Sequence, residues 1–186
     1  MIQNDIQELE KFQHVLGITF NNILLLKEAL THSSFVKHKN AGSLYNERLE
    51  FFGDSVLKFI VSEYLYENYS DLPEGELSKK RSKIVSDQFL TSLAIDIQLG
   101  DFLIMSFGEK KSGGHQKDSI LANAYEALLG AVYLDQGMDV VKDFFLSSYK
   151  KFAKMIDSGE FFDHKTLLQE VCQKTKIDLP FYKIVR

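Results

Sequence analysis

The sequence predicts an all-α protein with one sizeable hydrophobic core, and two observations support this fold class. Only two prolines, Pro73 and Pro180, occur in 186 residues, and proline is the residue that most disrupts a helix interior. Over the first 155 residues the apolar side chains recur at spacings of three and four, which is the period of an amphipathic helix. Hydrophobic residues make up 45% of the chain and charged residues 26%, as in a globular protein rather than a fibrous or disordered one.

Capping signals predict where the first helices begin. Asn22 precedes an apolar run and predicts a helix over residues 23–30. A longer helix is expected over residues 46–69, and the Ser-Asp-Leu-Pro segment that follows should end it. Ser78 is expected to cap a third helix that begins at Lys79.

The later helices are predicted from caps and from composition. Asp87 should cap a fourth helix that ends at Gly100, because glycine suits a C-terminal cap. The polar, glycine-containing segment 108–114 predicts a flexible loop. Residues 119–134 are small or apolar on nearly every face, which predicts a helix buried at the centre of the domain, and one further helix is expected over 140–156.

The composition changes after the last expected helix. We therefore divide the chain into a helical domain over residues 1–156, a linker over 157–162 and an incomplete second domain over 163–186. A remnant of that length cannot bury a core alone. Within it, a helix and the opening of a strand are expected.

The charge pattern limits how the protein can meet a nucleic acid. Residues 1–141 hold 13 basic and 20 acidic side chains, whereas residues 142–186 hold nine and six, and the net charge of the chain is −4. An acidic body argues against sequence-independent binding by bulk positive charge. It leaves open a body that meets phosphates through cations held by carboxylates.

Several protein classes are unlike this sequence. No apolar run approaches the roughly 20 residues of a transmembrane helix, and the first residues lack the pattern of a secretory signal. The single cysteine, Cys172, excludes an internal disulfide framework, and no Cys/His spacing resembles a zinc site. We therefore expect a cytoplasmic protein with no membrane partner.

The long expected helix carries an acidic face. Glu47, Glu50 and Asp54 stand at positions i, i+3 and i+7, which places their carboxylates on one side of the helix. Aromatic and aliphatic neighbours indicate that the segment is largely buried, and Gly53 lets another backbone come close. The alternative is a solvated acidic edge on an amphipathic helix, and the pattern alone does not separate the two.

The central helix adds Asn123 and Glu126, again at i and i+3. Glu126 lies among alanines, leucines and a glycine, so its carboxylate needs a partner. A cation with oxygen ligands, shared between the two helices, would supply one. Oxygen ligands without histidine or cysteine favour Mg²⁺ or Mn²⁺.

Residues 47–55, Glu-Arg-Leu-Glu-Phe-Phe-Gly-Asp-Ser, resemble the signature of the ribonuclease III family. Further matches follow in the family's order over residues 30–35, 74–81, 99–102, 108–114 and 119–128. Residues 163–170 and 180–182 are similar to the first helix and strand of a double-stranded-RNA-binding domain. The resemblance implies a ribonuclease III-type helical endonuclease domain, followed by the start of that α/β domain.

The resemblance also implies an activity. A family member would cleave double-stranded RNA by Mg²⁺-assisted phosphodiester hydrolysis, with Mn²⁺ able to substitute, and would leave 5′-phosphate and 3′-hydroxyl ends during rRNA and mRNA processing. It implies that Glu50, Asp54 and Glu126 are metal ligands, with Asn123 at the place of a fourth. Glu47, Asp54 and Glu126 are the implied catalytic carboxylates, with Glu47 beside the ligands.

Partners and RNA contacts follow from the same resemblance. Phe51 would insert into the second subunit of a homodimer. The expected RNA-binding residues are Lys79, Arg81, Lys110, Lys111, Thr166 and Gln169. A solvated surface is the alternative for the basic residues among these, and a hydrogen-bonded structural role is the main interpretation of His32.

The chain departs from the family pattern at two positions. Phe52 stands where an aliphatic residue is usual, and Asn123 replaces the aspartate that most bacterial members carry. The alternative function is therefore a double-stranded-RNA-binding protein whose cleavage is weakened or lost because of Asn123.

Overall fold

The computed structural model describes residues 2–36 and 44–158, with side chains described over 6–36 and 44–153. Every regular element in these ranges is a helix, which confirms the all-α prediction for this part of the chain. The elements are α1 (Ile2–Leu16), α2 (Ile23–Leu30), η1 (Ser33–Phe35), α3 (Glu47–Asn68), α4 (Glu74–Ile84), α5 (Asp87–Asp96), α6 (Leu99–Phe102), α7 (Phe107–Lys111), η2 (Gly114–Gln116), α8 (Asp118–Gln136) and α9 (Met138–Ser158). Within the described residues every helix is too short or too polar to cross a membrane.

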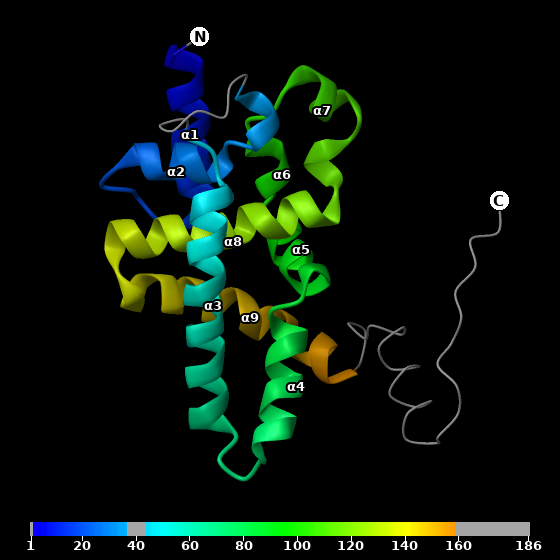
Figure 1. The fold of residues 1–186 in the computed structure, drawn as a ribbon. Helices are drawn as coiled ribbons and strands as arrows, with labels where there is room; N and C mark the ends of the chain where they lie inside the picture. The colour runs from blue at the N-terminus through cyan, green and yellow to red at the C-terminus, as the bar shows by residue number, and fades with distance from the viewer. Residues whose placement is uncertain (1, 37–43, 159–186) are drawn as a thin grey trace, which may run out of the picture.

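Helix α8 lies at the centre of the fold, as its composition predicts. It crosses behind α3 in Figure 1 and packs against α2, α3, α5 and α9. The side chain of Tyr125 on this helix is fully buried, and its ring stacks on Phe144 of α9 at 6.3 Å between centroids. Small and apolar residues on nearly every face allow α8 to be enclosed in this way.

Two glycines allow α3 and α8 to cross with their backbones in contact. A Cβ atom at Gly53 would overlap the backbone carbonyl oxygen of Glu126 and lie 2.6 Å from its carbonyl carbon. A Cβ atom at Gly130 would lie 2.6 Å from the carbonyl oxygen of Leu49. The prediction that Gly53 permits a close backbone approach is confirmed, and Gly130 is its counterpart on α8.

The N-terminus of α2 is held by a local side-chain cap and by a carboxylate from α8. The Asn22 side chain accepts a hydrogen bond from the backbone N–H of Leu24, which confirms the predicted cap. The carboxylate of Asp135, at the end of α8, accepts hydrogen bonds of 2.8 Å from the backbone N–H groups of Asn21 and Asn22. Backbone donors at a helix start favour a carboxylate, so this contact joins α2 to α8.

The predicted start of the third helix was wrong. Helix α4 begins at Glu74 after Pro73, rather than at Lys79 after Ser78. Proline is favourable at a helix start, and the acidic residues of the first turn complement the helix dipole. Ser78 lies inside the helix, where its hydroxyl donates a 2.7 Å hydrogen bond to Glu74.

The fourth helix also differs from its prediction. Ser86, not Asp87, caps α5 with its hydroxyl oxygen, and α5 ends at Asp96. The chain then turns through Gln98, whose φ of 55° is left-handed, and Gly100 lies within the short helix α6 instead of capping a long one. Gly100 is needed for space, since a Cβ there would overlap the carbonyl oxygen of His115.

The segment 108–114 was predicted as a flexible loop, and the structure corrects this. Helix α7 covers most of it, and the hydroxyl oxygen of Ser106 caps that helix by accepting a 3.2 Å hydrogen bond from the Glu109 N–H. Gly113 then adopts a φ of 77°, which glycine tolerates, and the chain enters η2. A local cap has ordered a polar segment that composition alone describes as a loop.

Helix α9 extends to Ser158 and so enters the segment expected as a linker over 157–162. The remainder of that segment and the expected second domain over 163–186, with Thr166 and Gln169, lie outside the described residues.

Candidate active site

The crossing of α3 and α8 brings the predicted acidic residues together. Glu50 and Asp54 project from α3, and Asn123 and Glu126 project from α8. The side chain of Asn123 hydrogen-bonds that of Glu50, and the charges of both Glu50 and Asp54 act on Glu126. The close approach at Gly53 places the two helices near enough for these interactions.

The carboxylates of this cluster act on one another, and nearby donors compensate their negative charge only in part. Burial raises the pKa of Glu126 to about 8, and the negative charges of Asp54, Glu50 and Asp87 add to the rise. Burial also raises the pKa of Glu50, followed by the charge of Glu47, while the hydrogen bond from Asn123 lowers it. Asp87, predicted only as a helix cap, lies between the two acidic helices in the chain, and its position near Glu50 and Glu126 follows from the fold. The site therefore favours either protons or an added cation.

A lysine on the same helix as Asp54 is in contact with the cluster. Lys58, one helical turn beyond Asp54, donates a 2.8 Å hydrogen bond to its carboxylate, and its charge lowers the pKa of Glu126 without cancelling the rise. Across the residues that the structure describes, no three His, Cys, Asp or Glu side chains are arranged to hold a metal ion. The predicted ligands thus share one region, but their side chains do not converge on a single point.

A hollow of about 230 Å³ lies beside the cluster. It is lined by His32, Ser33, Asn46, Glu47, Glu50, Ser119, Ile120 and Asn123. Glu47 is exposed, whereas Asn46 is buried and its backbone N–H donates a 2.9 Å hydrogen bond to the carbonyl oxygen of Thr31. This contact brings the segment before η1 to the wall of the hollow.

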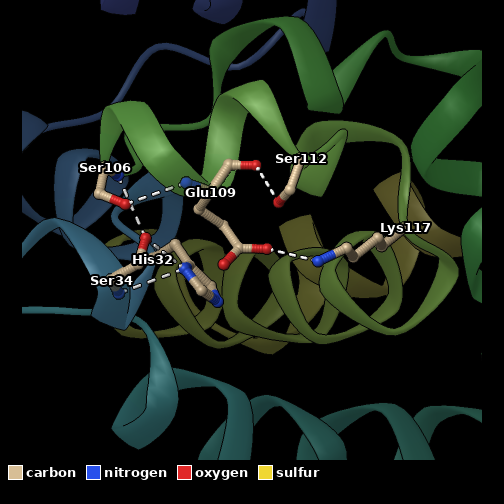
Figure 2. A network of polar contacts seen from close by, with 6 residues as sticks. All are labelled: His32, Ser34, Ser106, Glu109, Ser112 and Lys117. Carbon is tan, nitrogen blue, oxygen red and sulfur yellow. Dashed lines mark hydrogen bonds and ion pairs between the residues drawn. The ribbon is translucent and has the colours of Figure 1, made fainter.

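His32 is held by hydrogen bonds, as the structural interpretation of this residue predicts. Its Nδ1 atom lies 2.8 Å from the Ser34 hydroxyl and accepts a 3.2 Å hydrogen bond from the Ser34 N–H. The Ser34 hydroxyl oxygen in turn accepts a 3.1 Å hydrogen bond from the Ser106 N–H (Figure 2). Residues 32–34 are thereby tied to the start of α7.

Glu109 and Lys117 continue this network toward α8. Their side chains pair at 2.7 Å, as Figure 2 shows. The hydrogen bond from Lys117 and the charge of that lysine lower the pKa of Glu109. No role was predicted for Glu109, and its sequence signal was its place in a segment that resembles the family.

The predicted RNA-binding residues of the described chain fall on two separate elements. Lys79 and Arg81 lie on α4, where Lys79 pairs with Glu76 at 3.1 Å and Arg81 donates a 2.9 Å hydrogen bond to Ser62 of α3. Lys110 and Lys111 are exposed on α7. Figure 1 places α4 beside the far half of α3, away from α7, so the two pairs do not form one patch.

An exposed aromatic stripe runs along α3 beside the cluster. Phe51 is 78% exposed, and Phe59 and Tyr66 lie on the same side of the helix with exposed fractions of 54% and 78%. Phe52, the residue that departs from the family pattern, instead packs edge-on against Tyr133 at 5.3 Å. The aromatic substitution at position 52 is therefore accommodated by a ring contact with α8.

Comparisons with known proteins agree with the resemblance. A family model described as Ribonuclease-III-like matches residues 22–152. A protein of Clostridium tetani named Ribonuclease 3 is 47% identical over 172 residues, which cover 92% of this chain and 73% of the relative. The Ribonuclease 3 of Borreliella afzelii is 44% identical over 178 residues, covering 95% of this chain and 73% of that protein.

Solved structures give the same result for the fold. The nuclease domain of ribonuclease III from Campylobacter jejuni superimposes with a TM-score of 0.72 at 41% identity, over 77% of this chain and 96% of that one. That domain is described as flexible in a region involved in dimer formation. A Dicer from Pichia stipitis, with 23% identity and a TM-score of 0.53, shares the fold.

An acidic cluster on two crossed helices, in a fold shared with solved nuclease domains, defines the class of protein as an RNA-cleaving hydrolase. The chain belongs to the ribonuclease III family and is an endoribonuclease of that type.

Proposed function

We propose that this endoribonuclease cleaves double-stranded RNA and that it uses Mg²⁺, with Mn²⁺ able to substitute. The observation that carries the proposal is the crowding of carboxylates that Lys58 compensates only in part, where burial and three neighbouring carboxylates raise the pKa of Glu126 to about 8. A divalent cation supplies the charge that this cluster lacks. Carboxylate and amide oxygens are also the ligands that Mg²⁺ and Mn²⁺ prefer.

The residues that would hold the cation are Glu50, Asp54, Asn123 and Glu126. Asp54 would exchange its partner Lys58, half of whose side chain is exposed, for the ion. When bound, a divalent cation makes water a better nucleophile and offsets charge on the scissile phosphate. We assign catalytic roles to Asp54, to Glu126 and to Glu47, whose exposed carboxylate stands at the hollow where RNA would approach.

The proposed substrate is contacted mainly through its backbone. A-form RNA is recognised by its shape, phosphates and 2′-hydroxyls. On the described surface, Lys79 and Arg81 of α4 and Lys110 and Lys111 of α7 would approach the phosphates. Thr166 and Gln169, outside the described residues, would add contacts from a second domain over 163–186. Hydrolysis would leave 5′-phosphate and 3′-hydroxyl ends, and the enzyme would act in the cytoplasm on rRNA and mRNA.

We further propose that two copies of the chain form the working enzyme. The aromatic stripe that contains Phe51, Phe59 and Tyr66 leaves large apolar surfaces in water, and a self-complementary twofold interface would cover them. The Campylobacter jejuni domain, for which dimer formation is described, supports this proposal.

The test is a cleavage assay on an end-labelled perfect RNA duplex. We expect cleavage with Mg²⁺ or Mn²⁺, none in EDTA, and none of a DNA duplex of the same sequence. Glu126→Gln should nearly abolish cleavage while duplex binding persists, because it removes a ligand charge without changing shape. Glu67→Gln, on an exposed part of α3, is the matched control and should cleave normally.

Two outcomes of this assay would contradict the proposal. Undiminished cleavage in EDTA would show that the enzyme does not need a divalent cation. Equal cleavage of single-stranded RNA would show that it does not select double-stranded RNA. Binding of the duplex without cleavage under both cations would favour the alternative function, in which Asn123 has cost the chain its activity.

A further inference from the structure

Helix α7 presents an aromatic ring to solvent. Phe107, its first residue, is 83% exposed, and no large apolar side chain in the described part of the chain is more exposed. Burying such a ring normally stabilises a fold. Its exposure therefore makes Phe107 a candidate contact for another molecule. None of the contacts that fix α7 involves this ring.

Helix α7 is held in place by its cap and by contacts with neighbouring segments. Ser106 caps the helix through its hydroxyl, and a Cβ on the buried Gly114 would lie 2.7 Å from the Glu109 side chain, so η2 packs tightly on α7. The Ser106 N–H is bound to Ser34, whose hydroxyl contacts His32 (Figure 2). Because His32 lines the hollow beside Glu47 and Glu50, these hydrogen bonds connect α7 to one wall of the candidate active site.

The charge around Phe107 favours a polyanion as its partner. Lys110 and Lys111 follow at i+3 and i+4, the spacings that share a helix face with Phe107, and both are exposed. The body of the protein is otherwise acidic. An exposed aromatic ring flanked by lysines is the arrangement with which proteins stack on nucleic-acid bases while contacting the backbone.

We propose that Phe107 is a specificity-determining residue that stacks on an unpaired base of the RNA near the scissile bond. Inside an A-form duplex each base face is covered by its neighbours, so away from the duplex ends only a bulged or internal-loop base offers a face to the ring. The chain therefore prefers duplexes that are interrupted near the cleavage site over perfect duplexes. This inference rests on the proposed cleavage of double-stranded RNA.

The experiment is an internal competition between two RNAs in one reaction with Mg²⁺. One RNA is a perfect duplex, and the other is the same duplex with a two-nucleotide internal loop. The competition is repeated with the internal loop moved stepwise along the duplex. The two carry different end labels, so the ratio of their kcat/KM values is measured directly. We expect the intact enzyme to favour at least one interrupted duplex by about 5- to 10-fold, the low end of base–aromatic stacking.

Variants assign that preference to the ring. Phe107→Ala and Phe107→Leu should bring the ratio close to one, because neither offers an aromatic face, and Phe107→Tyr should restore it. Lys111→Ala should lower cleavage of both RNAs alike, since a phosphate contact carries no information about bases. Leu134→Ala, an exposed apolar residue at the far end of α8, is the matched control and should leave the ratio and both rates unchanged.

The outcomes separate this inference from the proposed function. If no duplex is cleaved, the proposed function fails. If both duplexes are cleaved but the ratio is near one, or is unchanged in Phe107→Ala, the stacking proposal is overturned while the function stands. In that case the ring serves a protein partner or a second copy of the chain.

Discussion

Replacing Gly53 by alanine should weaken the whole fold, although the same change in most helices is stabilising. In a helix interior alanine is favoured over glycine by about 1 kcal/mol. At position 53 the new methyl group would overlap the carbonyl oxygen of Glu126 and lie 3.0 Å from the N atom of Gly130. These obstacles are backbone atoms, so no rotamer change can relieve the overlap, and α3 must move away from α8.

The size of the effect follows from these opposing contributions. Overpacking a close-packed interior costs typically 1–3 kcal/mol and occasionally more, and contact with backbone places this site at or above the upper end. After the gain in helix propensity is subtracted, we expect a net loss of about 2 kcal/mol. For a domain of this size that corresponds to a melting temperature lowered by roughly 4–8 °C.

Urea denaturation followed by circular dichroism measures this loss, at one protomer concentration because association shifts apparent stability. Gly75→Ala is the matched control: Gly75 also lies in a helix, but a Cβ there meets nothing within 4 Å. It should be neutral or slightly stabilising. Equal urea midpoints for Gly53→Ala and Gly75→Ala would refute the argument that the two helices touch at this crossing.

Four further predictions follow from the site and its surroundings. Without divalent ions, stability should fall by about 2 kcal/mol, after allowance for solvent screening, as the pH rises from about 4.5, the ordinary pKa of Glu126, to its folded value of about 8. Glu126→Gln should flatten that dependence in urea midpoints, and an equal slope would contradict it. Asn123→Asp should lower the Mg²⁺ concentration for half-maximal cleavage, and superimposable titrations would remove position 123 from the ligand set. Asp135→Ala should cost about 1–2 kcal/mol by removing the carboxylate that accepts from two N–H groups at the start of α2, whereas Asp143→Ala, at an exposed position inside α9, should be neutral in thermal unfolding. Phe51→Ala should sediment as a 21.3 kDa monomer at concentrations where the parent is twice that mass, and identical profiles would exclude Phe51 from the interface.

The helical fold and the central position of α8 could be predicted from the sequence, because apolar spacing and small residues record burial directly. The role of Gly53 was equally accessible, since a glycine inside an apolar helix indicates close approach. Its counterpart Gly130 was not paired with it, because a sequence does not state which two helices cross. For the same reason, the sequence did not predict that Asp87 lies near enough for its charge to raise the pKa of Glu126.

The predicted helix boundaries were wrong where two local sequence signals compete. Pro73 and Ser78 are both credible helix starts, and the proline prevailed because it begins a turn already rich in acidic residues. The break at Gln98 had no sequence signal, since glutamine is not a residue that favours positive φ. The acidic residues were correctly grouped, but the Asp54–Lys58 pair, at i and i+4, was overlooked.

The enclosure of α8 has a consequence for synthesis of the chain. The apolar faces of α2, α3 and α5 are covered by a helix that ends at residue 136, long after those elements have been made. At an elongation rate of about 5–20 residues per second, the interval between the end of α3, at residue 68, and the end of α8 is about 3–14 s. By residue 96 the nascent chain holds all three of these helices, and their faces toward α8 stay uncovered until α8 is complete. The carboxylates of α3 and α8 then meet only when the last of these faces is closed, so the chain acquires its candidate active site and its stability in the same step.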